Sequence, residues 1–252
     1  IDSEGNESRG VQEQRQVWTD NSTFHDSNGS YTVPLKFYLK SGENVVRISS
    51  VRGVSYISDI YFYTIPSNNR YTDYLYENQG SEVNSADVSD WTSSKLQAEY
   101  PTSKSDPMLF STFDRASAFT EPPASTNIKL NIIGGERWET VGQWIEYTVN
   151  DIPKSGLYKI AIRYRQNLSA GIFTSREITV NTGAEGTKGE NFDEYIVQFP
   201  YGGNWEVTTP TDSSGDASLF WFEEGTNKIR LKAVTGELND LINACDGIVR
   251  SL

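Results

Sequence analysis

The chain alternates between apolar and polar side chains along much of its length, with a period of two residues. In 141–167, two alternating runs flank a break that contains Pro153 and Gly156. The alternating apolar positions are Ile145, Tyr147 and Val149 in the first run and Tyr158, Ile160, Ile162 and Tyr164 in the second. A period of two places such side chains on one face of a strand, and proline with glycine favours a reversal. The pattern predicts two half-buried antiparallel strands that pair with each other.

Similar runs predict strands elsewhere. The segments REITV at 176–180 and YIVQF at 195–199 each read as one strand. In 31–63, Leu35, Phe37 and Leu39 alternate with polar residues and Tyr38, SGEN predicts a turn, and YISDIYFY is a β-rich run. We therefore expect a strand meander over 31–63.

An internal repeat links the two halves of the chain. The stretch PLKFYLKSGENVVRISSVRG at 34–53 resembles ASLFWFEEGTNKIRLKAVTG at 217–236. The identities that carry the repeat are Gly42 with Gly225, Asn44 with Asn227, Arg47 with Arg230 and Gly53 with Gly236, every pair at the same separation. A repeat of this length indicates two copies of the closing strands of a β-sandwich.

The repeat predicts the domain organisation. Residues 1–66 are expected to be the C-terminal strands of a partial sandwich module, and 95–236 a nearly complete one. Residues 67–94 are polar and predict a linker, with a short helix over 71–77 whose tyrosines could dock on a module. The first module would take its opening strands from outside this sequence or from a partner chain, or would keep an open edge.

The last segment, 237–252, changes period. Its apolar residues recur at intervals of three and four, as Leu238, Leu241, Ile242, Cys245, Val249 and Leu252. This spacing predicts a short amphipathic helix, where the first copy has a β-rich run instead.

Composition excludes several classes of function. The formal net charge of −12 disfavours nucleic acid and anionic membranes as partners, and no apolar run is long enough to span a bilayer. Cys245 is the one cysteine and His25 the one histidine, which excludes an intramolecular disulfide and a multi-cysteine zinc site. Neither residue lies in a recognisable nucleophile motif. The abundant tyrosines are typical of β-sandwiches whose faces or loops contact polar ligands.

Four sequence elements occur in a familiar order. They are LQAEYP at 96–101, GQWIEY at 142–147, GLYKIAIR at 156–163 and GTNKI at 225–229. Together they resemble the carbohydrate-binding modules of families 6 and 35. The resemblance implies an all-β, galactose-binding-like jelly-roll β-sandwich. It also implies carbohydrate as the ligand.

A narrower resemblance covers nearly the whole chain. SKSDPM at 103–108, its continuation to WIEY at 144–147, and the linker YTDYLYENQG are similar to the N-terminal tandem modules of extracellular solute-binding lipoproteins of Gram-positive ABC sugar importers. It implies a non-catalytic accessory region outside the cell or attached to its surface. A solute-binding domain of the same protein is then an expected partner.

Candidate sugar contacts lie in two glycine-rich loops. In GGERWETVGQ at 134–143, Trp138 offers a stacking face beside the charged groups of Glu136 and Arg137, which suits sugar C–H faces and hydroxyls. Alternatively, Trp138 plugs the end of the sandwich and Arg137 pairs with an acid. Trp205, in YGGNWEV, is the candidate of the second loop. The family resemblance adds Asn239, the nearest residue to the sugar-binding asparagine of the last loop.

The family resemblance also implies a structural calcium ion. Related modules hold it with a carboxylate near the AE element and another near the last strand. Glu99 matches the first position, and Asp240 or Asp246 could reach the second.

No carboxylate occupies a recognisable catalytic motif, although glycosidase chemistry needs only two at a suitable separation. We therefore expect a binding protein and not an enzyme. The alternative is a structural spacer or protein-interaction module of a surface protein, without a sugar ligand.

Overall fold

The computed structural model describes residues 1–15, 24, 35–51, 53, 56–62, 71–84, 86–88, 91, 93–168, 170–181, 195–212 and 214–251. Its helices and strands are α1 (Tyr71–Glu77), β1 (Ser103–Lys104), β2 (Ser111–Thr112), β3 (Ile132–Ile133), the 3₁₀ helix η1 (Gly135–Arg137), β4 (Trp144–Ile152), β5 (Gly156–Lys159), β6 (Ile162–Tyr164), β7 (Phe173–Val180), β8 (Tyr195–Pro200), β9 (Glu206–Thr208), β10 (Leu219–Phe222), β11 (Gly225–Val234) and α2 (Leu238–Ser251).

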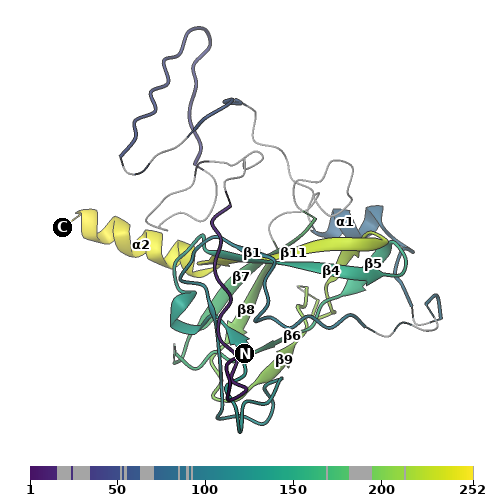
Figure 1. Ribbon diagram of the computed structural model, residues 1–252. Coiled ribbons are helices and arrows are strands. Elements are labelled where there is room, and N and C mark those ends of the chain that lie inside the picture. The colour runs from purple at the N-terminus through teal and green to yellow at the C-terminus, as the bar shows by residue number, and fades with distance from the viewer. Residues whose placement is uncertain are drawn as a thin grey trace.

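Two layers of antiparallel strands form a sandwich (Figure 1). One layer is a five-stranded sheet in the order β1-β4-β11-β7-β8, and the facing layer contains the strand pairs β10-β5 and β6-β9. The core between them combines side chains from both layers, among them Val149, Ile178, Phe199 and Phe220. The predicted all-β sandwich with a short C-terminal helix is confirmed.

The first predicted strand of 141–167 is present as β4, whereas the second is divided into β5 and β6 by a break at residues 160–161, and the predicted pairing is wrong. β4 pairs with β11 and β1, whereas β5 pairs with β10 in the other layer. The turn between β4 and β5 therefore connects the two layers instead of closing a hairpin. Each strand turns one apolar face to the core, so the same alternation arises whether consecutive strands share a sheet or face each other. In β5 the opposite face is buried as well, because Leu157 packs against Tyr74 of α1.

Helix α1 has the predicted bounds, and two of its tyrosines, Tyr71 and Tyr74, dock on the module. Tyr74 is fully buried against Leu157 and Trp221. The hydroxyls of Tyr71 and Tyr74 accept hydrogen bonds from the backbone N–H groups of Leu219 and Trp221, each at 2.6 Å. These two side chains thus occupy backbone donors of β10 that face away from β5.

The chain after α1 also joins this layer. The N–H of Val83 donates to the carbonyl of Leu157 at 3.1 Å, and the N–H of Leu157 donates to the carbonyl of Ser81 at 2.9 Å. A Cβ at Gly156 would lie 2.6 Å from the carbonyl oxygen of Ser81, so glycine is required for this close approach. Part of the predicted linker therefore packs on the sandwich.

The described residues of 35–62 contain no strand, so the strand meander expected over 31–63 is not formed within them. Ladder hydrogen bonds need a neighbouring strand, and no strand of the described module pairs with this stretch. The assignment of 1–66 to a second module stays a prediction, as do the other domain limits.

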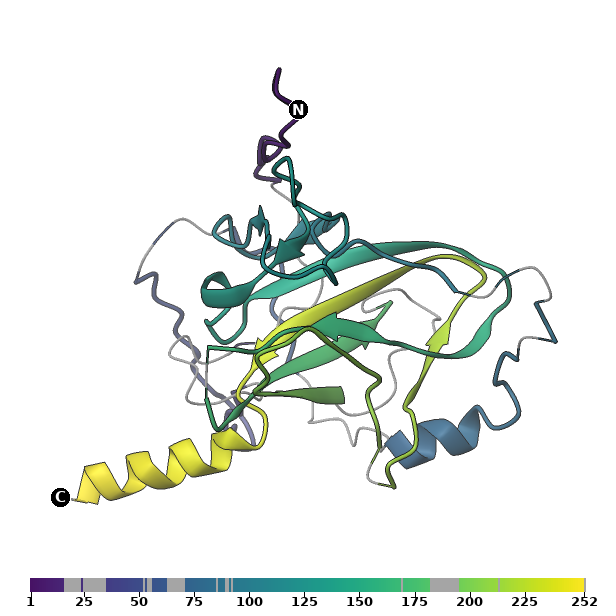
Figure 2. The ribbon, with the colours of Figure 1, turned by 90° about the horizontal axis from the view of Figure 1, so that it is seen from below.

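Helix α2 continues from β11 and projects away from the two layers, as both views show (Figure 2). Its side chains at Leu241, Cys245 and Ile248 are exposed. Within the described residues, no helix is both long and apolar enough to cross a bilayer.

Candidate functional site

The loop after β2 is held in place by one buried aspartate. Asp114 is 7% exposed, and its backbone N–H donates to Oδ1 of Asn131 at 2.8 Å. Nδ2 of Asn131 donates back to the carbonyl of Asp114 at 3.1 Å, and the hydroxyl of Thr120 donates to the same carbonyl at 3.3 Å. This network fixes the loop, so the Asp114 carboxylate has a defined position.

Strand pairing brings Arg165 and Trp205 to that carboxylate. Tyr164 and Glu206 are opposite each other in β6 and β9, so the next residue after β6 and the last before β9 are neighbours. Arg165 forms a salt bridge of 3.0 Å with Oδ2 of Asp114, and Nε1 of Trp205 donates to the same oxygen at 2.8 Å. The guanidinium carbon of Arg165 lies 5.1 Å from the centre of the Trp205 ring.

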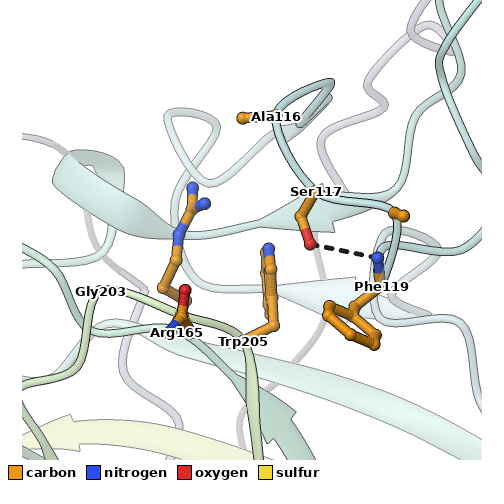
Figure 3. Close-up of a pocket in the computed structure, with 8 residues that line it drawn as sticks. Ala116, Ser117, Phe119, Arg165, Gly203 and Trp205 are labelled. Atoms are coloured by element: carbon orange, nitrogen blue, oxygen red, sulfur yellow. Dashed lines mark hydrogen bonds between the residues drawn. The ribbon is translucent and has the colours of Figure 1, made fainter.

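Arg165 and Trp205 form one side of a pocket of about 340 Å³. Its lining residues are Ala116, Ser117, Ala118, Phe119, Arg165, Gly203, Asn204 and Trp205. Figure 3 shows the indole of Trp205 between Arg165 and Phe119, with Ser117 above Phe119. The hydroxyl of Ser117 accepts the N–H of Phe119 at 3.1 Å and keeps its own proton for donation.

The buried carboxylate of Asp114, which holds the lining residues Arg165 and Trp205, is ionised at neutral pH. Burial alone would raise the pKa of Asp114, but hydrogen bonds from Trp205 and Ala116 and the charge of Arg165 outweigh it and leave that pKa below its usual range. The Arg165–Asp114 pair is therefore formally neutral. The pocket consequently offers polar donors and aromatic faces without a net charge from this pair.

Of the five predicted sugar contacts, Trp205 alone lines this pocket. Trp138 packs with the core residues Leu109, Ile145 and Tyr147, and its Nε1 donates to the carbonyl of Gln143 at 3.1 Å. The guanidinium carbon of Arg176 lies 4.2 Å from the centre of its ring. Burial lowers the pKa of Arg176 to about 10. Trp138 thus has the contacts of a structural plug.

The two charged residues before Trp138 have different surroundings. Glu136 is exposed, and the guanidinium carbon of Arg137 lies 4.4 Å from the ring centre of Phe110. Arg9, from the N-terminal segment, lies 3.7 Å from the same centre. Among the described residues, Arg137 therefore contacts an aromatic ring instead of the acid that the alternative reading expected.

Asn239 lies in the first turn of α2, and its Oδ1 is buried without a hydrogen-bond partner in the described part of the chain. Asp240 and Asp246 also belong to α2, but their side chains lie outside what the structure describes. The prediction that either of them binds calcium stays a prediction.

Glu99 is the acid that best fits a calcium ligand. It is 2% exposed, and its Oε1 has no hydrogen-bond partner within the described residues. Calcium takes six to eight oxygen ligands, yet these residues contain no group of three or more acidic, histidine or cysteine side chains placed to hold a metal. The described residues therefore supply one fitting carboxylate and not a complete site.

Replacing Glu99 by glutamine is expected to raise the melting temperature near pH 7, with a smaller effect near pH 4. Burial, and then the charge of Glu7, raise the pKa of Glu99 above its usual 4.5. A raised pKa favours the folded state below the usual pKa, and this contribution is lost as the pH rises through the folded pKa. Thermal unfolding at both pH values, in the presence of a chelator, measures the change.

The exposed Glu136→Gln is the matched control and should change neither curve. Equal melting temperatures of Glu99→Gln and wild type at pH 7 would contradict the raised pKa. Adding calcium then tests the ion separately, because an ion that binds the folded state raises its melting temperature. A rise in wild type that Glu99→Gln lacks would make Glu99 a ligand.

Sequence reasoning missed Asp114, Arg165 and Phe119. Arg165 is a charged residue directly after the apolar positions of an alternating run, and Asp114 and Phe119 lie in a stretch without periodicity. The sequence offered one weak signal: 116–119 and 203–205 both contain small residues next to an aromatic residue. Nothing in the linear sequence joins Asp114 to Trp205.

No family model and no curated protein matches the chain. A solved structure of a family 35 carbohydrate binding module from an environmental isolate matches at 18% identity, covering 56% of this chain and 80% of that one, with a TM-score of 0.36. "Xyl-CBM35 in complex with glucuronic acid containing disaccharide" matches at 18% identity, over 56% and 81% of the two chains, with a TM-score of 0.36.

A cycloisomaltooligosaccharide glucanotransferase of Paenibacillus sp., complexed with cycloisomaltoheptaose, matches at 15% identity with a TM-score of 0.37. The match covers 56% of this chain but only 16% of the glucanotransferase. Similarity at this level carries no statement about ligand or activity. The functional argument therefore rests on the chemistry of the pocket.

Proposed function

We propose that this protein is a non-catalytic carbohydrate-binding module whose ligand occupies the pocket between Phe119 and Trp205. The observation that carries the proposal is the pocket itself, which combines two aromatic side chains with Arg165, Ser117 and Asn204. Its volume of about 340 Å³ lies near the lower end of the usual range for ligand sites. A pocket of this size suits one or two sugar residues.

The lining groups match the two kinds of surface that a sugar presents. Aromatic faces pack on the C–H-rich side of a pyranose ring. The hydroxyls require donors and acceptors, which Ser117, Asn204 and Arg165 provide. Because Asp114 orients both Arg165 and Trp205, these two groups are preorganised and lose little freedom on binding.

Trp205→Ala is expected to abolish the sugar-dependent rise in melting temperature. Across a panel of mono- and oligosaccharides, a sugar that binds only the folded state raises the unfolding midpoint. Removal of a central aromatic contact should weaken binding by about 2 kcal/mol or more, roughly thirtyfold in Kd. Calorimetric titration with the sugar of the panel that binds best measures the loss of affinity.

Two further variants separate binding from folding. Trp205→Phe keeps an aromatic face but loses the indole N–H that donates to Asp114, so it should retain part of the affinity. Tyr76→Ala removes a 79% exposed aromatic residue that does not line the pocket and should bind like wild type. Undiminished affinity in Trp205→Ala would remove the pocket from the proposal, and a flat panel with wild type would remove sugar binding.

We further place the protein outside the cell or attached to its surface, as an accessory region in sugar uptake. This part of the proposal rests on the resemblance of 103–147 and of the linker to modules of solute-binding lipoproteins. A solute-binding domain of the same polypeptide is then the expected neighbour.

The second candidate function is a structural spacer. The docking of α1 on β10 favours it, because it packs the segment between the two repeat copies rigidly onto one module. A spacer predicts no response to any sugar and no effect of Trp205→Ala beyond stability. The same thermal panel therefore distinguishes the two functions.

A further inference from the structure

Residues 35–51 form a turn with two extended arms and leave their apolar side chains in solvent. In Figure 1 this segment is a hairpin-shaped excursion from the sheets. The exposed fractions are 68% for Phe37, 52% for Val46 and 45% for Ile48. Neighbouring apolar side chains that are exposed to solvent mark an interaction site.

The turn repeats a turn of the sandwich in atomic detail. Oδ1 of Asn44 accepts the N–H of Lys40 at 3.1 Å, and Nδ2 of Asn44 donates to the carbonyl of Lys40 at 2.8 Å. At the equivalent position, Oδ1 of Asn227 accepts the N–H of Glu223 at 2.8 Å, and Nδ2 donates to its carbonyl at 2.7 Å. The repeat found in the sequence is therefore also a structural repeat of the β10–β11 turn.

The two turns also share their glycine conformation. Gly42 has φ = 92° and Gly225 has φ = 89°. Such positive values favour glycine at both positions. Residues 35–51 thus carry the local conformation of a closing hairpin, without the strands that surround β10 and β11.

The equivalents of the exposed residues are buried in the sandwich. Phe37 corresponds to Phe220, which is 1% exposed, and Val46 corresponds to Ile229, which packs against the core. In the sandwich, Phe220 and Ile229 lie in strands that have neighbours: β5 pairs with β10, and β4 and β7 flank β11. Equivalent neighbouring strands would bury the apolar side chains of 35–51.

The charge of Arg47 indicates which residue a neighbouring strand would place opposite it. Arg47 corresponds to Arg230, which donates to Oε2 of Glu146 in β4 at 2.7 and 3.1 Å. No salt bridge of Arg47 exists within the described part of the chain. A strand of β4 type would bring a glutamate opposite Arg47.

We propose that residues 35–51 are the closing hairpin of a second sandwich and bind a polypeptide with strands of the β4 and β5 type. That partner presents alternating apolar residues on one face and a glutamate opposite Arg47. A second copy of the complete module does not fit, because its β4 and β5 already pair with its own β11 and β10. The proposal does not depend on sugar binding.

The test uses the full chain and a labelled synthetic peptide of residues 143–160, which spans β4 and β5. We expect saturable binding by fluorescence anisotropy and slower amide hydrogen exchange over 42–51 when the peptide is present. Val46→Asp, on the face that corresponds to Ile229, should weaken binding at least tenfold. Val45→Asp, on the opposite face that corresponds to Lys228, should bind like the unchanged chain.

Adjacent valines on opposite faces make this pair a matched control. Both are at least half exposed, so neither aspartate should unfold the sandwich. Displacement of the module's own β4 by the peptide would leave both variants unaffected and would overturn the proposal. Absence of binding to the unchanged chain would overturn it as well.

Charge reversal tests the position of the glutamate. A peptide with Glu146→Lys should bind the unchanged chain less tightly, and the chain variant Arg47→Glu should restore its affinity. Restoration would place the peptide in the register of β4 on β11. Equal losses without restoration would overturn the assignment of Arg47.

Discussion

Phe220→Ala is expected to destabilise the protein by about 3–5 kcal/mol, the usual cost of truncating a buried phenylalanine. Phe220 is 1% exposed and lies in the core between the two layers, where its ring contacts that of Tyr195 at a centroid distance of 5.2 Å. Alanine would leave a cavity that the surrounding strands cannot fill. Urea unfolding followed by tryptophan fluorescence measures the free energy of unfolding.

The repeat supplies a matched control for this experiment. Phe37 occupies the equivalent position of the first copy and is 68% exposed. Phe37→Ala should change the free energy of unfolding by less than about 0.5 kcal/mol, as surface substitutions usually do. Equal losses from the two variants would show that the first copy is packed as tightly as the second, contrary to the structure.

Asp114→Ala is the second change with a large expected effect, because it should remove both stability and the ligand pocket. Asp114 accepts hydrogen bonds from Trp205 and the backbone of Ala116 and pairs with Arg165. Alanine would leave these donors without an acceptor, and breaking a buried charge pair costs about 3–5 kcal/mol. Thermal unfolding with and without sugar measures both effects.

Asp114→Asn separates charge from shape. Asparagine keeps an acceptor for Trp205 but cannot neutralise Arg165, so it should lose less stability than alanine. The lowered pKa of Asp114 means that its contribution is present above the usual value of 3.8 and is lost as the pH falls through the folded pKa. The wild-type advantage over Asp114→Ala should therefore shrink in acid. Retention of wild-type stability by Asp114→Ala at neutral pH would refute this role.

Local patterns predicted the elements of the fold more reliably than their partners. The helix over 71–77 and the strands at 176–180 and 195–199 all appear near the predicted bounds. Their residues select a backbone conformation through propensity and alternation, which are local properties. The predicted pairing of β4 with β5 was wrong because alternation indicates that one face is buried but not which strand covers it.

The candidate site divides in the same way. A glycine-rich loop with a tryptophan identified Trp205, since such a loop exposes an aromatic residue to ligands. The same reasoning selected Trp138, whose indole instead packs on the core with its N–H donated to Gln143. The difference between the two tryptophans lies in their neighbours, Arg176 in one case and Asp114 in the other. Neither neighbour is close in sequence.

The sequence by itself determined the all-β class, the amphipathic C-terminal helix and the repeat of the closing hairpin, because these follow from the spacing of residue types along the chain. Only the tertiary structure decided that β4 and β5 belong to opposite layers and that Asp114, Arg165 and Trp205 meet. The physical reason is that a pocket joins loops through long-range strand pairing. The pairing of β6 with β9 brings together residues 42 to 46 positions apart, and local propensity does not encode that contact.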